Sequence, residues 1–110
     1  MGLTKTQNYT EEQLQLSKMM KVMGHPARIA ILQSIIKTKT CVCGGLVTEI
    51  GLAQSTVSQH LKELKSVGLI QGTIEGTSMC YCINVDSWNE LNKQTNNLFH
   101  SANGKDLDCC

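Results

Sequence analysis

The sequence predicts a small, mainly α-helical domain with one β-hairpin. The chain has 110 residues, of which 41% are hydrophobic, and that length suits one compact domain, taken as residues 1–110. Apolar residues recur at helical spacing in several stretches, and one later stretch alternates as strands do. The order argued below is helix, helix, helix–turn–helix, β-hairpin and helix, which is that of a winged helix-turn-helix domain.

Two amphipathic helices are predicted over residues 10–36. Thr10 and Gln13 have the spacing of a capping box, and an apolar stripe follows them as far as Gly24. Pro26 suits the first turn of the next helix, whose wide apolar face makes it the central core helix. His25, between the two helices, is predicted to act as a cap or core contact.

Residues 44–67 are predicted to form the helix–turn–helix. In its second helix Val57, Leu61 and Leu64 fall on one face, opposite a face of Ser, Gln and Lys side chains. Gly68 is predicted to end this helix in the left-handed conformation.

The start of the same helix lacks a capping side chain. Ala53 stands where Ser would accept a backbone hydrogen bond, at a cost of about 1 kcal/mol unless Ser55 or Thr56 takes over.

The second half of the chain is predicted to contain the hairpin and a last helix. Residues 69–85 form the hairpin, whose wing runs from about 71 to 81, and residues 86–100 form the helix, opened by a second capping box at Ser87. Residues 101–110 form a loose tail. Trp88 and Leu91 are predicted to pack with the N-terminal helix on a partner subunit, which makes the protein a homodimer.

Composition and charge exclude several classes of protein. The formal net charge is +1, so any DNA binding must depend on the local placement of charge. The longest apolar stretch is well short of the roughly 20 residues of a membrane span, and the N-terminus lacks the apolar region of a secretory signal. We therefore expect a cytoplasmic protein without membrane contact, in which the six cysteines bind metal, sense redox state or are buried.

The polar face of the second helix is the candidate DNA-reading surface. Ser, Thr, Gln and Lys side chains can reach phosphates and base edges, whereas the alternative is an ordinary solvated helix face. His60 lies beside this face, where it either touches DNA or has a partner in the core. The predicted DNA-binding residues are Gln54, Ser55, Thr56, Ser58, Gln59, His60 and Lys62, with Thr73 and Thr77 in the wing.

Several blocks of sequence resemble the ArsR family of bacterial metalloregulatory repressors. They are residues 20–32 (MKVMGHPARIAIL), 41–43 (CVC), 54–64 (QSTVSQHLKEL) and the wing start at 68–70 (GLI). The resemblance covers roughly residues 16–84 and implies a homodimer that binds an operator palindrome and leaves it when an inducer binds.

The same resemblance implies an inducer site at Cys41 and Cys43. Soft thiolates favour thiophilic ions such as arsenic(III), antimony(III), zinc or cadmium. Residue i and residue i+2 lie on opposite sides of a helix, so the two sulfurs can act together only if the helix start is distorted. A third sulfur is lacking where some family members have one, because Leu46 stands there.

The remaining cysteines leave alternatives open. Cys109 and Cys110 are candidates for the third sulfur, folding back or crossing the dimer, or else belong to a disordered tail. Cys80 and Cys82 alternate within a strand and are predicted to pack in the hairpin. A zinc site on the last helix is not supported, because His100 is its only imidazole.

The prediction for function is a repressor, not an enzyme, released from DNA by arsenite or antimonite. The alternatives are a repressor of the same fold that senses oxidants or persulfides through a disulfide, and a zinc or cadmium sensor. A thiol oxidoreductase is disfavoured because no βαβ pattern or activating base accompanies the cysteines. A winged-helix interaction module that does not bind DNA is a further alternative.

Overall fold

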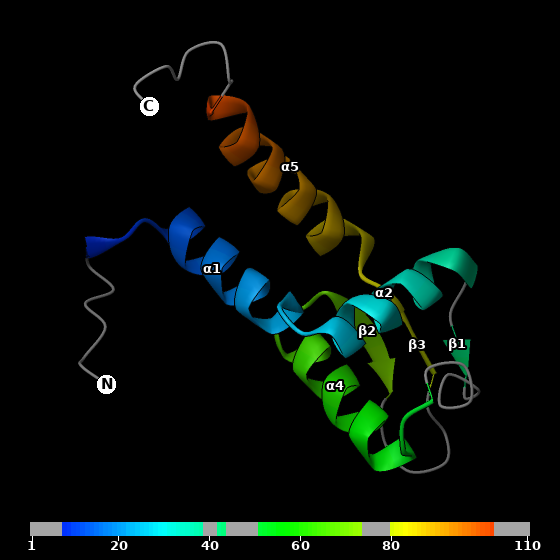
Figure 1. Cartoon of the computed structure of the whole chain (residues 1–110). Helices are drawn as coiled ribbons and strands as arrows, with labels where there is room; N and C mark the ends of the chain where they lie inside the picture. Colours follow the sequence, from blue (N-terminus) through cyan, green and yellow to red (C-terminus); the bar gives the residue numbers. More distant parts are fainter. Residues whose placement is uncertain (1–7, 39–41, 44–50, 74–79, 103–110) are drawn as a thin grey trace.

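A computed structural model describes residues 8–38, 42–43, 51–73 and 80–102 of the chain. The elements are α1 (Glu11–Met23), α2 (Pro26–Thr38), β1 (Val42–Cys43), α4 (Gln54–Ser66), β2 (Ile70–Thr73), β3 (Cys80–Ile83) and α5 (Val85–Ser101). Figure 1 shows α2 and α4 beside the small sheet, with α1 and α5 extending away from it. The predicted first helix of the helix–turn–helix, residues 44–50, and the tail from residue 103 lie outside the described residues.

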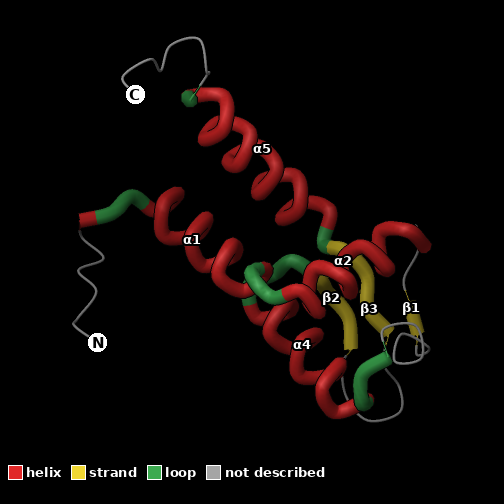
Figure 2. The backbone as a smooth tube through the Cα atoms, in the orientation of Figure 1, coloured by secondary structure: helices red, strands yellow, loops and turns green. Residues whose placement is uncertain are grey.

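The sheet has three antiparallel strands in the order β1-β3-β2 (Figure 2). The hairpin of β2 and β3 was predicted, and its register pairs Ile70 with Ile83 and Thr73 with Cys80. The strand β1 was not predicted. It pairs Val42 with Tyr81 and Cys43 with Cys80, so the segment after α2 is tied to the wing.

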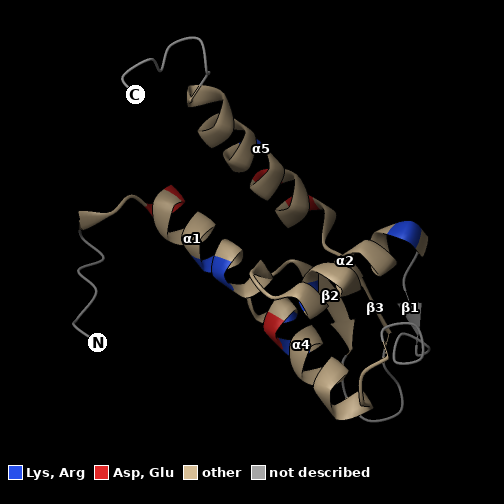
Figure 3. Cartoon of the chain, in the orientation of Figure 1, with Lys and Arg blue, Asp and Glu red and all other residues tan. Residues whose placement is uncertain are grey.

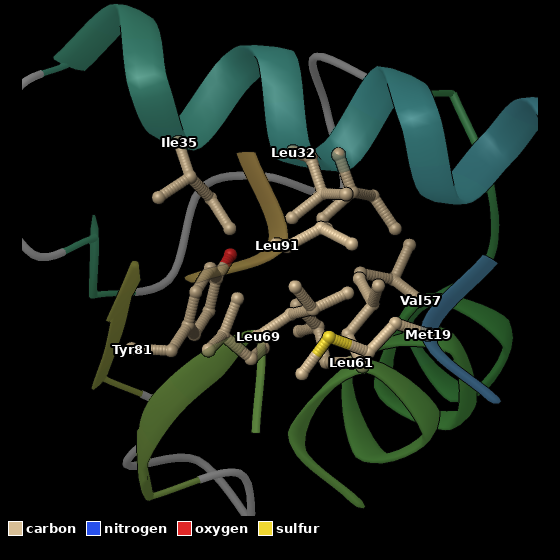
Figure 4. Close-up of a cluster of buried hydrophobic side chains, with 11 residues drawn as sticks. Met19, Leu32, Ile35, Val57, Leu61, Leu69, Tyr81 and Leu91 are labelled. Carbon is tan, nitrogen blue, oxygen red and sulfur yellow. The ribbon is translucent and has the colours of Figure 1, made fainter. Parts of the chain in front are cut away.

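The core lies between α2, α4 and the sheet. Tyr81, the largest fully buried side chain, points from β3 toward α2, while Met19 and Leu91 reach the same cluster from α1 and α5 (Figure 4). The other buried apolar side chains come from α2 (Ile31, Leu32, Ile35), α4 (Val57, Leu61, Leu64) and the start of the hairpin (Leu69, Ile70). The core therefore holds α4 by one face only.

The first two helices begin as their sequences indicate. The Thr10 side chain accepts a hydrogen bond from the Gln13 backbone N–H at 3.1 Å, and the Gln13 side chain accepts one from the Thr10 N–H at 2.9 Å. This reciprocal pair is the predicted capping box. His25 is the predicted cap at α2, where its Nδ1 accepts a hydrogen bond from the Ala27 N–H at 3.0 Å.

The last helix begins earlier than its predicted capping box. Its N-cap is Asn84, whose side chain accepts a hydrogen bond from the Ser87 N–H at 3.4 Å and whose carbonyl accepts one from the Trp88 N–H. Ser87 is therefore already inside the helix. Asn is as good a cap as Ser, and here it follows the strand directly.

The predicted packing of α5 on a partner subunit is wrong for Leu91. Its side chain is buried in the chain's own core, and Trp88 packs against the same cluster. The apolar side chains that α5 leaves exposed are Val85, Leu98 and Phe99, and α1 and α2 expose Met20, Ile29 and Ile36. Among the described residues, no helix is long and apolar enough to cross a membrane.

Candidate nucleic-acid interface

The helix α4 presents a polar face because its apolar face is fixed in the core. Val57, Leu61 and Leu64 are fully buried, at the i, i+4 and i+7 positions of one helical stripe. The opposite side is open to solvent, and its exposed residues are Gln54, Ser55, Thr56, Gln59, Lys62, Lys65 and Ser66. Ser58 is half-buried. Most of the predicted DNA-binding residues are thus brought together on one accessible surface.

The N-terminus of α4 has no side-chain cap. The N-cap is Ala53, as predicted, and it makes no side-chain capping hydrogen bond. Free N–H groups and the positive end of the helix dipole favour an anionic partner such as a phosphate. The start of α4, which has no side-chain cap, is therefore suited to face the phosphates of a nucleic acid.

The C-terminus of α4 ends in the predicted left-handed glycine. Gly68 has a φ of 81°, its N–H donates to the Lys65 carbonyl, and the Leu69 N–H donates to the Leu64 carbonyl. These two hydrogen bonds make a Schellman motif. They turn the chain sharply into β2, so the wing begins beside the helix that precedes it.

One lysine joins the helix to the wing. Lys65 Nζ donates a hydrogen bond to the Gly72 carbonyl at 2.6 Å, which leaves Lys62 as the basic side chain that projects freely from the middle of α4. Figure 3 shows basic residues on α1, α2 and α4, and acidic residues on α1, α4 and α5. Binding to DNA would therefore depend on hydrogen bonding at this face as much as on net charge.

Gln59 is the central polar side chain of the exposed face. Its Nε2 donates a hydrogen bond to Glu63 Oε1 at 3.4 Å, which orients the amide. An amide held in this way can present a donor and an acceptor together, the pattern that reads adenine in the major groove.

His60 does not belong to the exposed face. Its ring is buried, its Nδ1 accepts a hydrogen bond from Arg28 Nε at 3.1 Å, and its centroid is 4.7 Å from that of His25. Arg28 also donates to the Val22 carbonyl at 3.0 Å. Of the two sequence-based alternatives for His60, the core partner is the one observed.

The pKa of His60 is lowered from its usual value of 6.5, first by burial and then by the nearby His25 and Arg28. A neutral ring is required, because Arg28 is always a donor and the Nδ1 must accept. His60 thus joins α4 to the start of α2, and Arg28, which the sequence did not single out, supplies the contact.

The wing residues are partly described. Thr73 is exposed at the end of β2, whereas Thr77 lies outside the described residues. Gln71 is also exposed and donates a weak hydrogen bond to Cys82 Sγ at 3.9 Å.

The cysteines are distributed differently from the prediction. Cys43 lies in the strand β1 and is opposite Cys80 in the register. Cys80 is exposed and disulfide-bonded rather than packed in the hairpin, and Cys82 is a half-buried free thiol. Cys41, Cys109 and Cys110 lie outside the described residues.

Within the described residues, no group of three or more His, Cys, Asp or Glu side chains is placed to hold a metal ion. The donor chemistry at residues 41–43 nevertheless fits a thiophilic ion, since thiolates prefer soft ions.

Comparison with known proteins decides the family. Residues 25–71 match the model of the bacterial regulatory protein, arsR family. Over 83 residues the chain is 32% identical to the uncharacterized HTH-type transcriptional regulator MJ1325 of Methanocaldococcus jannaschii, covering 74% of this chain and 92% of that protein. The chain belongs to the ArsR family.

Other relatives of this ArsR-family chain agree with the assignment. The uncharacterized HTH-type transcriptional regulator Rv0081 of Mycobacterium tuberculosis is 35% identical over 63 residues, 57% of this chain and 55% of that protein. The structure of NolR from Sinorhizobium fredii has a TM-score of 0.61 at 25% identity, covering 90% of this chain and 96% of that one. The match spans about half the length of the first curated relatives.

Family membership bears on two predictions. The family is one of transcriptional regulators, which agrees with the prediction that the chain is not an enzyme. The predicted winged helix-turn-helix fold is confirmed, because the chain's helices and hairpin align over most of the NolR structure.

Proposed function

We propose that this ArsR-family chain is a homodimeric, cytoplasmic repressor that binds operator DNA through α4 and the wing. The observation that supports it most is the exposed face of α4, which is polar along its length and fixed by three buried side chains. The residues proposed to contact DNA are Gln54, Ser55, Thr56, Ser58, Gln59 and Lys62, with Thr73 and Thr77 in the wing. His60 is left out because it is buried against Arg28.

The homodimer rests on exposed apolar side chains of the flanking helices. Phe99 is 65% exposed and Leu98 49% exposed on α5, and Met20 is 37% exposed on α1. Large apolar side chains at such a density are typical of a surface that a partner covers. A second copy would place two α4 helices on one side of the DNA, as a palindromic operator requires.

We propose arsenite or antimonite as the inducer, bound by the thiolates of Cys41 and Cys43. Cys109 and Cys110 stay candidates for further sulfurs. A bound thiophilic ion would draw the donors together next to the helix–turn–helix and change the separation of the two α4 helices. Coupling of about 1–3 kcal/mol between the two sites would lower DNA affinity about 5- to 150-fold.

A second candidate function is a repressor of the same fold that responds to oxidants or persulfides. The observation that favours it is the disulfide at Cys80 in a sheet that also contains Cys43. Release by zinc or cadmium is the third version of the same proposal, since both ions accept thiolates.

The test is fluorescence anisotropy of the reduced protein on DNA from its own promoter region, with and without arsenite. We expect the wild type to bind this DNA tightly and a few equivalents of arsenite to abolish the binding. A Cys41→Ser, Cys43→Ser double variant should stay bound in the presence of arsenite. DNA binding that arsenite does not change, but that cadmium, zinc or an oxidant abolishes, would show that the inducer is one of these instead of arsenite. Absence of any DNA binding would overturn the proposal that the protein is a repressor.

A further inference from the structure

The strands β1 and β3 bring two cysteines face to face. Cys43 and Cys80 are direct partners in the antiparallel register, next to the pair Val42 and Tyr81. Cys80 is disulfide-bonded, and Cys82, two residues along the same strand, is a free thiol. The bond of Cys80 therefore leads to a cysteine on another part of the chain.

Strand geometry selects the partner. Directly opposed residues of an antiparallel pair have Cα atoms about 4.5 or 5.5 Å apart, depending on the hydrogen-bonding position. Both values lie within the roughly 4.4–6.8 Å that a disulfide allows. Diagonal neighbours are about 7–8 Å apart and exceed it. Among the cysteines in the described sheet, only Cys43 is directly opposite Cys80 and so meets this condition.

We infer that Cys43 and Cys80 form a cross-strand dithiol that opens and closes the inducer site: reduced, the pair offers two thiolates to a thiophilic ion, and oxidised, it is a disulfide that cannot bind one. This inference rests on the proposed function, because it assigns Cys80 to the inducer site of the same repressor. Cys80 is exposed, so its sulfur is accessible to small thiols and disulfides.

The oxidation step is a thiol–disulfide exchange with a low-molecular-weight disulfide. One cysteine thiolate attacks a sulfur of the small disulfide, forming a mixed disulfide and releasing one small thiolate. The second cysteine thiolate then attacks the mixed disulfide, forming the Cys43–Cys80 bond and releasing the second small thiolate. The protein loses two electrons, and the small disulfide gains them as it is split into two thiolates.

The two states differ in ligand capacity because the thiolate is the metal-binding form of cysteine. In the reduced protein, Cys80 supplies a thiolate opposite Cys43, so that the pair offers two sulfurs to the ion. In the oxidised protein, both sulfurs of the pair are consumed by the disulfide. Oxidation should thus make the repressor insensitive to its inducer.

The pairing is tested first by mapping the disulfide. The reduced protein is treated with oxidised glutathione, its remaining thiols are blocked with N-ethylmaleimide, and unreduced peptides from trypsin and chymotrypsin are analysed by mass spectrometry. Cleavage after Tyr81 separates Cys80 from Cys82. We expect a link between the peptide of residues 40–62 and a peptide ending at Tyr81.

Matched variants resolve which cysteine takes part. The cross-link should persist in Cys41→Ser and Cys82→Ser and disappear in Cys43→Ser and Cys80→Ser. Wild-type protein whose Cys80 is linked to Cys109 or Cys110, or is blocked by the maleimide after oxidation, would overturn the pairing without depending on the folding of any variant.

The effect on ligand binding is tested by titrating arsenite alone, without DNA, into reduced and oxidised wild type by calorimetry. We expect binding to the reduced protein, at least tenfold weaker binding to the oxidised protein, and recovery after reduction. Reduced Cys80→Ser should bind at least tenfold more weakly, whereas Cys82→Ser should match wild type.

If the reduced protein and the mapped Cys43–Cys80 disulfide form bind arsenite with equal affinity, the inference that this dithiol opens and closes the inducer site is overturned. Failure of the proposed inducer has a different signature: the reduced wild type would then bind no arsenite although the cross-link forms. That result would contradict arsenite gating but leave the mapped pair and DNA binding in place.

Discussion

At the scale of single residues, the buried ring of His60 shows how the fold sets the charge of one group. Arg28 Nε donates to its Nδ1 at 3.1 Å, an arrangement that a protonated ring cannot accept. Burial, His25 and Arg28 lower its pKa below 6.5. The folded protein therefore binds a proton at His60 less readily than the unfolded chain does.

The consequence is a stability that depends on pH. As the pH falls below 6.5, the usual pKa of His60, the unfolded chain takes up a proton there before the folded protein does. The free energy of unfolding should decrease by up to about 1.4 kcal/mol per pH unit until the pH reaches the lowered pKa. Urea unfolding of wild type and His60→Asn over this window measures it.

The variant should lack this part of the slope, because Asn keeps an acceptor for Arg28 but does not titrate. His100→Asn is the matched control, since His100 is exposed on α5, and it should keep the wild-type slope. Identical slopes in wild type and His60→Asn would contradict the account of His60.

Gly72 allows β2 and β3 to approach closely. Its φ is 129°, and a Cβ added there would lie 2.1 Å from the Cys80 carbonyl oxygen and 2.8 Å from Tyr81 Cα. We expect Gly72→Ala to lower the free energy of unfolding by about 3 kcal/mol or more, combining backbone strain with the clash. Thermal and urea unfolding check the value.

Gly51→Ala separates the two effects. Gly51 also has a positive φ, 80°, but a Cβ there meets nothing within 4 Å. Only the backbone cost of about 1–2 kcal/mol is expected. Equal losses in the two variants would show that the close approach of the strands contributes nothing.

At the scale of elements, the start of α4 is a place where stability can be added. Ala53 makes no side-chain hydrogen bond as N-cap, so Ala53→Ser should raise the free energy of unfolding by about 1 kcal/mol. Thr10→Ala, which removes the observed cap of α1, should lower it by a similar amount. Chemical unfolding of both variants measures these two changes. An Ala53→Ser variant with the wild-type free energy of unfolding would contradict the view that the start of α4 lacks a cap.

The helices show which elements can be predicted from sequence. Val57, Leu61 and Leu64 predict the buried face of α4 because local periodicity is enough. The start of α5 is ambiguous, since Asn84 and Ser87 are both good caps and only the end of β3 decides between them. Local patterns thus predict the helices well and their first residues less well.

The strand β1 shows what local patterns miss. Two residues, Val42 and Cys43, make no recognisable strand signal, and they become a strand only by pairing with β3 almost forty residues later. Motif reading alone therefore does not identify the cysteine that faces Cys43. The alternation of Cys41-Val42-Cys43 and Cys80-Tyr81-Cys82 was the one available signal.

At the scale of the whole molecule, the account requires that two chains associate through the flanking helices. Phe99 is 65% exposed on α5, so Phe99→Lys should weaken the dimer at least tenfold while leaving the fold intact, because it introduces charge into an apolar surface. Sedimentation across a concentration series measures this. Asn96→Lys, also exposed on α5, is the control, and a dimer equally strong in wild type and Phe99→Lys would place the interface elsewhere.

The most direct test of the account is the DNA affinity of Gln59→Ala, measured by anisotropy on a promoter fragment and on a scrambled fragment of the same composition. Gln94→Ala is the matched control, because Gln94 bonds to Glu90 on α5 as Gln59 bonds to Glu63 on α4. We predict that wild type and Gln94→Ala prefer the promoter fragment and that Gln59→Ala loses about 5- to 150-fold of that preference. Equal preference in all three proteins would contradict reading of DNA by the exposed face of α4.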